Sequence, residues 1–134
     1  MDPQEEEHLR LLSIFHYVLA GLGALFACFP LIHFVVGLCL IFFANKTSQQ
    51  APPLFVGLMF TCLGGAMFAI GQACAVMIYL TGRYIKERKN YWFIFVMACI
   101  ECAFFPFGTV LGVFTILVLS RPSVKMLFGV ATTR

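Results

Sequence analysis

Charged residues are scarce in this chain of 134 residues, which contains nine Lys or Arg and six Asp or Glu. They make up 11% of the sequence, whereas soluble globular domains carry about 25%. A chain with so few charges lacks the polar surface that keeps an ordinary domain in water. The composition therefore excludes a secreted module, a cytosolic enzyme and a nucleic-acid-binding protein.

Hydrophobic residues take the place of the missing charges and make up 61% of the chain. They gather in three stretches with at most one charged side chain each, residues 11–43, 54–82 and 90–120. Each stretch is longer than the roughly 20 apolar residues that cross a bilayer. Because a backbone in lipid must satisfy its own hydrogen bonds, such stretches are expected to be helical. The sequence predicts an all-α membrane protein with a single integral membrane domain.

Two prolines and the basic residues determine the predicted number of crossings. Pro30 and Pro106 lie near the middle of the first and last stretches, where a proline kinks or breaks a helix. Basic residues flank the last stretch on both sides, and the positive-inside rule places both flanks in the cytoplasm. An even number of crossings must separate them, so residues 90–105 and 107–120 are predicted to form a hairpin that turns near Pro106.

The resulting prediction is a four-helix transmembrane bundle with a proline-kinked first helix and a C-terminal helical hairpin. Its membrane segments are residues 11–43, 54–82, 90–105 and 107–120. Residues 1–10 begin the first helix in the cytoplasm, and residues 121–134 form a cytoplasmic tail. If the chain also turned back at Pro30, there would be five crossings and the acidic N-terminus would lie outside.

The connector between the second and third apolar stretches is the most basic part of the chain. Its four cations are Arg83, Lys86, Arg88 and Lys89. They are interpreted first as topology determinants that face the cytoplasm. Anionic lipid headgroups are a partner compatible with that position, and these four side chains are predicted to contact them.

Small residues recur with helical spacing in the second apolar stretch. Helices associate in lipid through close packing of such residues, because lipid chains are as apolar as the side chains. The packing candidates are Gly57, Thr61, Gly64, Gly65, Ala69, Gly71 and Ala73, with Gly108 and Gly112 in a GxxxG spacing near the C-terminus. They are predicted to pack helices within one chain. The alternative is that these glycine-rich faces form the seam of a homo-oligomer.

Four polar side chains stand out within the apolar stretches, namely His16, His33, Gln72 and Glu101. Glu101 is the only carboxylate there, and an ionisable group at membrane depth is costly. We expect it to be protonated or paired with His33, Gln72 or a hydroxyl, so that it pins helices together. The alternative is a polar path for ions or protons that uses Glu101 and the histidines. The two histidines lack metal-ligand spacing, so no metal site is predicted.

All six cysteines lie in the apolar stretches, where a free cysteine behaves as a small hydrophobic residue. No disulfide is therefore expected. Cys99 and Cys102 form a CxxC pair, as in membrane thiol oxidoreductases, but residues 44–53 offer no further cysteine for such a reaction. Catalytic and phosphate-binding motifs are absent from the sequence. The sequence predicts no cofactor and no enzymatic activity.

Segments near both ends carry a resemblance. They are residues 101–115 (ECAFFPFGTVLGVFT), 121–125 (RPSVK), 8–17 (HLRLLSIFHY) and 29–33 (FPLIH). In these segments the chain resembles a family of small bacterial multi-pass inner-membrane proteins without an assigned activity. The resemblance implies a location in the inner membrane and no mechanism. In layout alone, the chain also resembles CD20-like four-span proteins.

Three functional hypotheses follow from these observations. The first and preferred one is a non-enzymatic membrane protein of interaction or scaffold type. The second is a small transporter or channel subunit that uses Glu101 and the intramembrane histidines. The third is a membrane thiol oxidoreductase that uses the CxxC pair.

Overall fold

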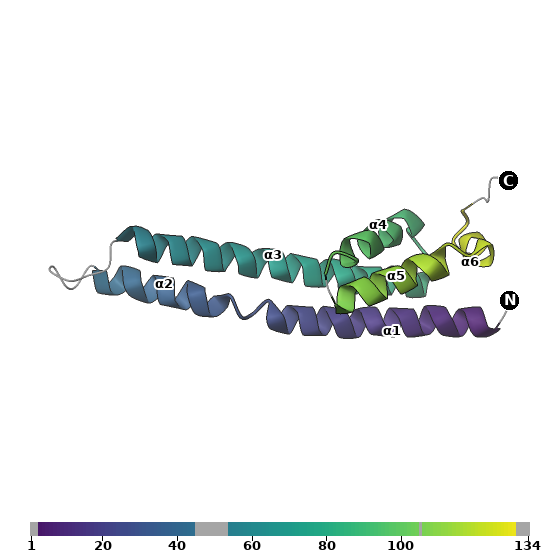
Figure 1. Ribbon diagram of the computed structural model, residues 1–134, viewed down its shortest axis with the longest axis horizontal. Helices are drawn as coiled ribbons and strands as arrows, with labels where there is room; N and C mark the ends of the chain where they lie inside the picture. Colours follow the sequence, from purple (N-terminus) through teal and green to yellow (C-terminus); the bar gives the residue numbers. More distant parts are fainter. Residues whose placement is uncertain (1–2, 45–53, 105, 131–134) are drawn as a thin grey trace. The chain divides into compact units, whose positions relative to one another are not determined.

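The structure, a computed structural model, describes residues 3–44, 54–104 and 106–130. Within these residues the chain folds into helices and turns without strands, which confirms the all-α prediction. Figure 1 labels the six helices of the described chain. They are α1 (Pro3–Phe26), α2 (Leu31–Ala44), α3 (Leu54–Glu87), α4 (Tyr91–Glu101), α5 (Phe107–Leu119) and α6 (Pro122–Leu127).

Two parts of the chain are long and apolar enough to cross a membrane. One is the run Pro3–Phe43, which contains α1 and most of α2, and the other is α3. The helices α4 and α5 have 11 and 13 residues. At 1.5 Å per residue they are about 16 and 20 Å long, against a hydrocarbon core of about 30 Å. Both are shorter than the predicted segments 90–105 and 107–120.

The described helices belong to two compact units. The terminal unit consists of Met1–Gly21 and Ala75–Arg134, and the central unit is Leu22–Cys74. The long helices α1 and α3 each contribute residues to both units. Each unit is described below by itself.

Pro30 interrupts the first apolar run in the central unit. The prediction was a kink within one helix, but α1 ends at Phe26 and α2 begins at Leu31, with a turn between them. Proline has no N–H to donate, so the turn is closed by shorter-range bonds. The N–H of Phe29 donates to the carbonyl of Phe26 at 3.0 Å, and that of Leu31 donates to the carbonyl of Cys28 at 3.0 Å.

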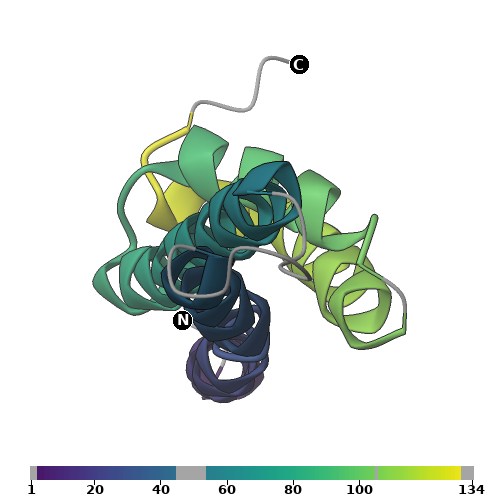
Figure 2. The same ribbon diagram turned by 90° about the vertical axis from the view of Figure 1, so that its left-hand side faces the viewer.

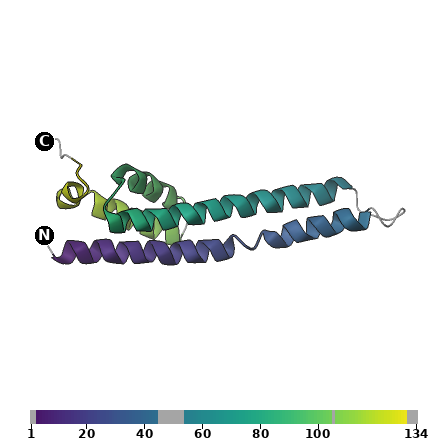
Figure 3. The ribbon, with the colours of Figure 1, turned by 180° about the vertical axis from the view of Figure 1, so that it is seen from behind.

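Glycines bring α2 and α3 together in the central unit, where the two helices lie side by side (Figures 1 and 3). A Cβ atom on Gly64 would come within 2.6 Å of the backbone nitrogen of Phe34. On Gly57 it would come within 2.8 Å of the Ile41 side chain, and on Gly71 within 2.7 Å of Ala27 Cβ. These three glycines recur every seventh residue, a spacing that drifts only about 20° around a helix.

The other predicted series on α3 leaves this interface. A spacing of four residues drifts about 40° per step, so its later members turn away from α2. Thr61 still touches Gly37, and Gly65 contacts the ring of Phe34, but Ala69 and Ala73 are exposed. Both series were predicted to form one packing face. In the structure the glycines spaced by seven residues pack against the neighbouring segment of the chain, whereas the last members of the series spaced by four residues are exposed.

In the terminal unit, α4 and α5 form an antiparallel hairpin (Figure 2). Gly108 and Gly112 lie at its seam. A Cβ atom on Gly108 would come within 2.6 Å of the Glu101 carbonyl oxygen, and one on Gly112 would overlap the Ala98 carbonyl oxygen. The GxxxG spacing is therefore used between the two arms of the hairpin.

The core of the terminal unit joins five helices. Its buried apolar side chains come from α1, α3, α4, α5 and α6, and are Leu9, Leu12, Ile85, Tyr91, Ile94, Val118, Leu119 and Val124. The phenol of Tyr91 donates to the carbonyl of Leu119 at 3.2 Å, which joins the start of α4 to the end of α5. Val124 is only 1% exposed, so the described part of the C-terminal tail packs on this core.

Candidate functional site

The carboxyl group of Glu101 lies at the end of α4 and is buried, with 1% of the residue exposed. Its Oε2 lies 3.1 Å from Nε2 of His16 on α1, and His16 is fully buried. We expected His33, Gln72 or a hydroxyl as the partner. The structure instead pairs Glu101 with the other intramembrane histidine.

The backbone of α1 fixes the tautomer of His16. Its Nδ1 lies 2.8 Å from the carbonyl oxygen of Leu12. A carbonyl oxygen can only accept a hydrogen bond, so Nδ1 carries a proton and Nε2 faces the carboxyl group. The carboxyl group of Glu101 and Nε2 of His16 thus face each other directly, between α4 and α1.

The carboxyl group is incompletely satisfied. The contact with His16 is close but is not aligned as a hydrogen bond, and Glu101 Oε1 has no hydrogen-bond partner among the described residues. Three buried hydroxyls of the terminal unit donate to backbone carbonyls, Ser13 to Gly82, Thr81 to Met77 and Thr115 to Leu111. Since a buried polar group without a full set of partners destabilises a fold, the retention of Glu101 calls for a structural or functional reason.

Gly82 on α3 allows α1 to approach closely at the pair. A Cβ atom there would come within 3.0 Å of His16 Cβ and 3.1 Å of the Ser13 carbonyl oxygen. The hydroxyl of Ser13 donates to the Gly82 carbonyl at 2.7 Å. Gly82 and Ser13 were not among the predicted site residues. Ser13 could have been found, because it is polar and lies three residues before His16, on the same face of a helix.

His33 and Gln72 belong to the central unit and have contacts there. His33 is exposed and stacks on Phe60, with ring centroids 6.1 Å apart. The amide of Gln72 donates to the carbonyl of Ala24 at 3.2 Å and lies 3.7 Å from Cys28 Sγ. The four polar residues predicted as one set thus fall into a buried pair and two residues with separate contacts.

The described residues contain no cluster of three or more His, Cys, Asp or Glu that could hold a metal ion. The six cysteines are free, with Cys99 exposed and Cys102 half-buried. What the buried pair offers is a close polar contact between an imidazole on α1 and a carboxyl group on α4.

The polar segments of the terminal unit meet through ion pairs and hydrogen bonds. Glu6 Oε1 near the start of α1 lies 2.6 Å from Nη2 of Arg88, directly after α3. The carboxylate of Glu5 accepts a hydrogen bond from the hydroxyl of Ser123 on α6. The beginning of the chain therefore contacts both the basic connector and the described part of the tail.

Three of the four connector cations have acidic partners. Besides Arg88, Arg83 donates from Nε to Glu87 at 2.8 Å, and Lys89 Nζ lies 3.5 Å from the same carboxylate. The hydrogen bond from Arg83 lowers the pKa of Glu87 and raises that of Arg83. Among the described residues, Lys86 has no such partner.

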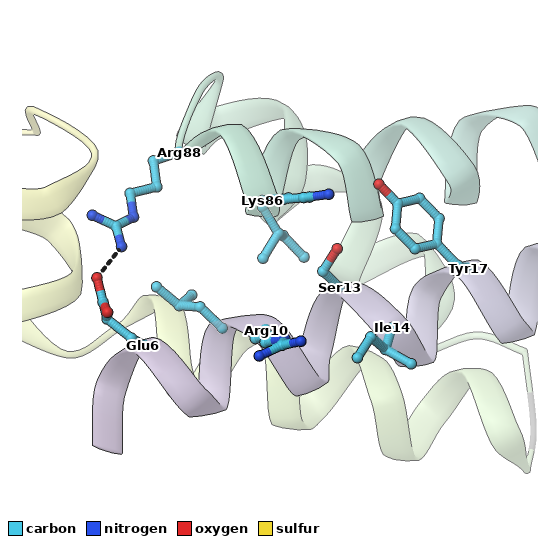
Figure 4. A pocket seen from close by; sticks show the side chains of 9 residues that line it. Glu6, Arg10, Ser13, Ile14, Tyr17, Lys86 and Arg88 are labelled. Atoms are coloured by element: carbon cyan, nitrogen blue, oxygen red, sulfur yellow. Dashed lines mark hydrogen bonds and ion pairs between the residues drawn. The ribbon is translucent and has the colours of Figure 1, made fainter. Parts of the chain in front are cut away.

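An open cleft of about 460 Å³ lies between α1 and α3 at this polar end (Figure 4). Six residues from one face of α1 line it, Glu6, Leu9, Arg10, Ser13, Ile14 and Tyr17. The other three lining residues are Ile85, Lys86 and Arg88.

Comparison of the chain with family models, with curated proteins and with solved structures gives no match.

Proposed function

We propose that this chain is a small multi-pass membrane protein of interaction or scaffold type, without enzymatic activity. Its apolar helices expose large side chains on both units, including Phe55 at 73% and Phe107 at 76%. A hydrocarbon solvent accommodates such surfaces, whereas water does not. The resemblance to bacterial inner-membrane proteins supports the inner membrane as the location.

The contacts between polar segments support a topology with both termini in the cytoplasm. In the terminal unit the start of α1 contacts both the basic connector and the described part of the tail. The positive-inside rule assigns the basic connector, and with it these contacts, to the cytoplasm. The alternative with five crossings would put Glu6 and Arg88 on opposite sides of the membrane, although their side chains lie 2.6 Å apart.

The level of Glu101 indicates how far the α4–α5 hairpin enters the membrane. Its partner His16 lies five residues beyond Leu11, where the first apolar stretch begins, and this distance is about 8 Å along a helix. Glu101 is also the last residue of α4, so the tip of the hairpin follows directly. A tip at that level, on arms of about 16 and 20 Å, favours a hairpin that enters from the cytoplasm and returns to it.

A re-entrant hairpin adds no crossing, and the two arms of the four-crossing bundle add two, so the number of crossings is even in both arrangements. Both arrangements leave the basic connector and the tail on one side of the membrane. They differ at Phe107, which the four-crossing bundle places at the outer surface. The polar groups of the turn suit either environment, because Phe104 N–H bonds to Glu101 and the Thr109 hydroxyl bonds to Cys102.

The observation that carries the interaction-type function is the enclosure of the His16–Glu101 pair. A transporter needs polar groups along an accessible path, but both members of this pair are buried. His33 and Gln72 have contacts within the central unit instead. The pair therefore suits a pin between α1 and α4 better than a step in a relay.

The proposed partners follow from what remains free. Atoms of the same chain occupy the space beside the glycines of α3 and α5. A homo-oligomer would therefore use the exposed surface around Ala69 and Ala73. Anionic lipid is the second proposed partner, at the basic connector.

Proton flux through reconstituted vesicles tests this function. We expect vesicles with the purified protein to lose a pH gradient no faster than protein-free vesicles, and Glu101→Gln to leave that rate unchanged. Flux in the unmodified protein that Glu101→Gln abolishes would overturn the proposal in favour of the transporter. As a control, Thr81→Val removes a buried hydroxyl that donates only to its own helix.

A further inference from the structure

The cleft between α1 and α3 combines free cations with apolar walls. Arg10 from α1 and Lys86 from α3 are exposed at its rim (Figure 4), and neither has an acidic partner among the described residues. The ion pair of Glu6 and Arg88 adds no net charge. The cleft therefore carries a net charge of about +2 when its lysine and arginines are protonated.

The polarity of the cleft changes in one direction along α1. The lining residues Glu6, Arg10, Ser13 and Tyr17 recur every three or four residues, so they lie along one face of the helix. They cover 11 residue steps, or about 16 Å. The ion pair of Glu6 lies at the aqueous end, Arg10 and Ser13 follow, and Ile14 and Tyr17 lie beyond Leu11 in the apolar stretch.

We propose that this cleft binds the headgroup of an anionic phospholipid from the cytoplasmic leaflet. Arg10 and Lys86 would contact the phosphate, since charge-assisted hydrogen bonds to phosphate are among the strong ones. Ile14 and the Tyr17 ring would contact the start of the acyl chains. A free phosphate would contact only the cations at the rim, whereas a phospholipid would also contact the apolar residues at the other end of the cleft. This site rests on the proposed membrane insertion.

The site differs from the lipid contact predicted from the connector alone. Arg83 and Lys89 share the carboxylate of Glu87, which leaves them less available to a second anion. Arg10 was not among the predicted lipid contacts, because it lies more than 70 positions from the connector in the sequence. The structure places both Arg10 and Lys86 at one cleft.

Native mass spectrometry of the full chain in detergent tests the site. The probes are phosphatidylglycerol, phosphatidylcholine with the same acyl chains, and glycerol 3-phosphate. The test variant is Arg10→Gln with Lys86→Gln, and the matched control is Arg121→Gln with Lys125→Gln, two cations that lie outside both the cleft and the basic connector. Both variants remove two positive charges, and both must keep the melting temperature of the unmodified protein.

We expect phosphatidylglycerol to bind more tightly than the other two probes. The test variant should lose roughly 20- to 30-fold in affinity for it, because each basic residue at an anionic lipid contributes about fivefold. The control should change by less than about threefold, since cations outside a site contribute little. If the pair Arg121 and Lys125 contributes as much as the cleft pair, the attraction is general and the site is refuted.

Three other outcomes would also overturn the inference. Equal binding of phosphatidylcholine would remove the role of net charge. Equal binding of glycerol 3-phosphate would make the ligand a soluble phosphoester. A chain that is monodisperse without detergent would refute membrane insertion itself, so that the failure of the proposed function is distinguishable from that of the lipid site.

Discussion

The buried pair of His16 and Glu101 leads to a prediction with a characteristic sign. Replacing either residue with leucine leaves the other buried and without its polar partner, since His16 and Glu101 are 0% and 1% exposed. Replacing both removes the unpaired groups and leaves an apolar contact. We therefore expect each single variant to lose stability and the double variant to lose clearly less than the sum of the two single losses.

The magnitude follows from the environment and the geometry. Removing one partner of a buried ion pair costs about 3–5 kcal/mol in soluble proteins, whereas polar contacts between membrane helices reach about 1.7 kcal/mol at most. The pair here is fully enclosed, but its contact is not aligned as a hydrogen bond. We expect a loss of about 2 kcal/mol for each single variant, between these two ranges. The coupling energy should be about 2 kcal/mol, or roughly thirtyfold in the unfolding equilibrium.

A double-mutant cycle measured by thermal and SDS-induced unfolding in detergent micelles provides the assay. His16→Leu and Glu101→Leu should each lower the melting temperature by roughly 6–10 °C. Thr81→Val is the control, because its hydroxyl is equally buried but bonds only within α3. Strictly additive losses in the double variant would refute the reasoning, since the two groups would then not be coupled.

Further predictions concern packing, the connector and the thiols. Gly112→Ala should destabilise the α4–α5 hairpin by about 1–3 kcal/mol through overpacking. Gly23 has open space around it, so Gly23→Ala should stabilise α1 by roughly 0.5–1 kcal/mol. The same unfolding assay checks both variants, and equal effects on stability would contradict the packing described for Gly112. The pKa of Glu87 is lowered by its hydrogen bond from Arg83, so its contribution to stability is present above its ordinary pKa and is lost as pH falls below it. The protection factors of the amides at the end of α3, which compare exchange with the intrinsic rate at each pH, should therefore fall below about pH 4.5, and Arg83→Gln should abolish this dependence. Alkylation in denaturant without prior reduction should modify all six cysteines, as counted by intact mass, and a missing pair of adducts would point to a disulfide.

Much of the fold could be predicted because long apolar stretches of a sequence follow simple rules. Long stretches without charge had to be helical, and Pro30 and Pro106 had to interrupt them, since neither can donate a backbone hydrogen bond. The glycines of α3 were visible as a packing face. Their partner Gly37 was not, because the register between two helices depends on the turn that joins them.

The last two helices are shorter than the apolar segments that contain them, for a physical reason. Hydropathy marks where apolar residues lie, but it does not show where a turn ends the hydrogen bonds of a helix. Among the described residues, the turn after Glu101 takes residues 102–104 from the first expected arm. The arms that remain are too short to span a typical bilayer core without thinning it.

The candidate site could be predicted in its members but not in its pairing. Glu101 was identifiable as the one carboxylate among apolar residues, and His16 as a titratable group on the first helix. Pairing them requires knowledge that α4 ends level with the middle of α1 and that Gly82 lets α1 approach α3 there. Neither fact can be read from residues 85 positions apart in the sequence.

Cysteine accessibility in whole cells tests the topology most directly. In a chain without its native cysteines, Asn45→Cys, Lys89→Cys and Phe107→Cys are treated separately with a membrane-impermeant maleimide. We expect labelling of position 45 in intact cells, of position 89 only after the cytoplasmic face is exposed, and of position 107 from neither side. Labelling of position 89 in intact cells would contradict the shared cytoplasmic end, and labelling of position 107 there would contradict the re-entrant hairpin.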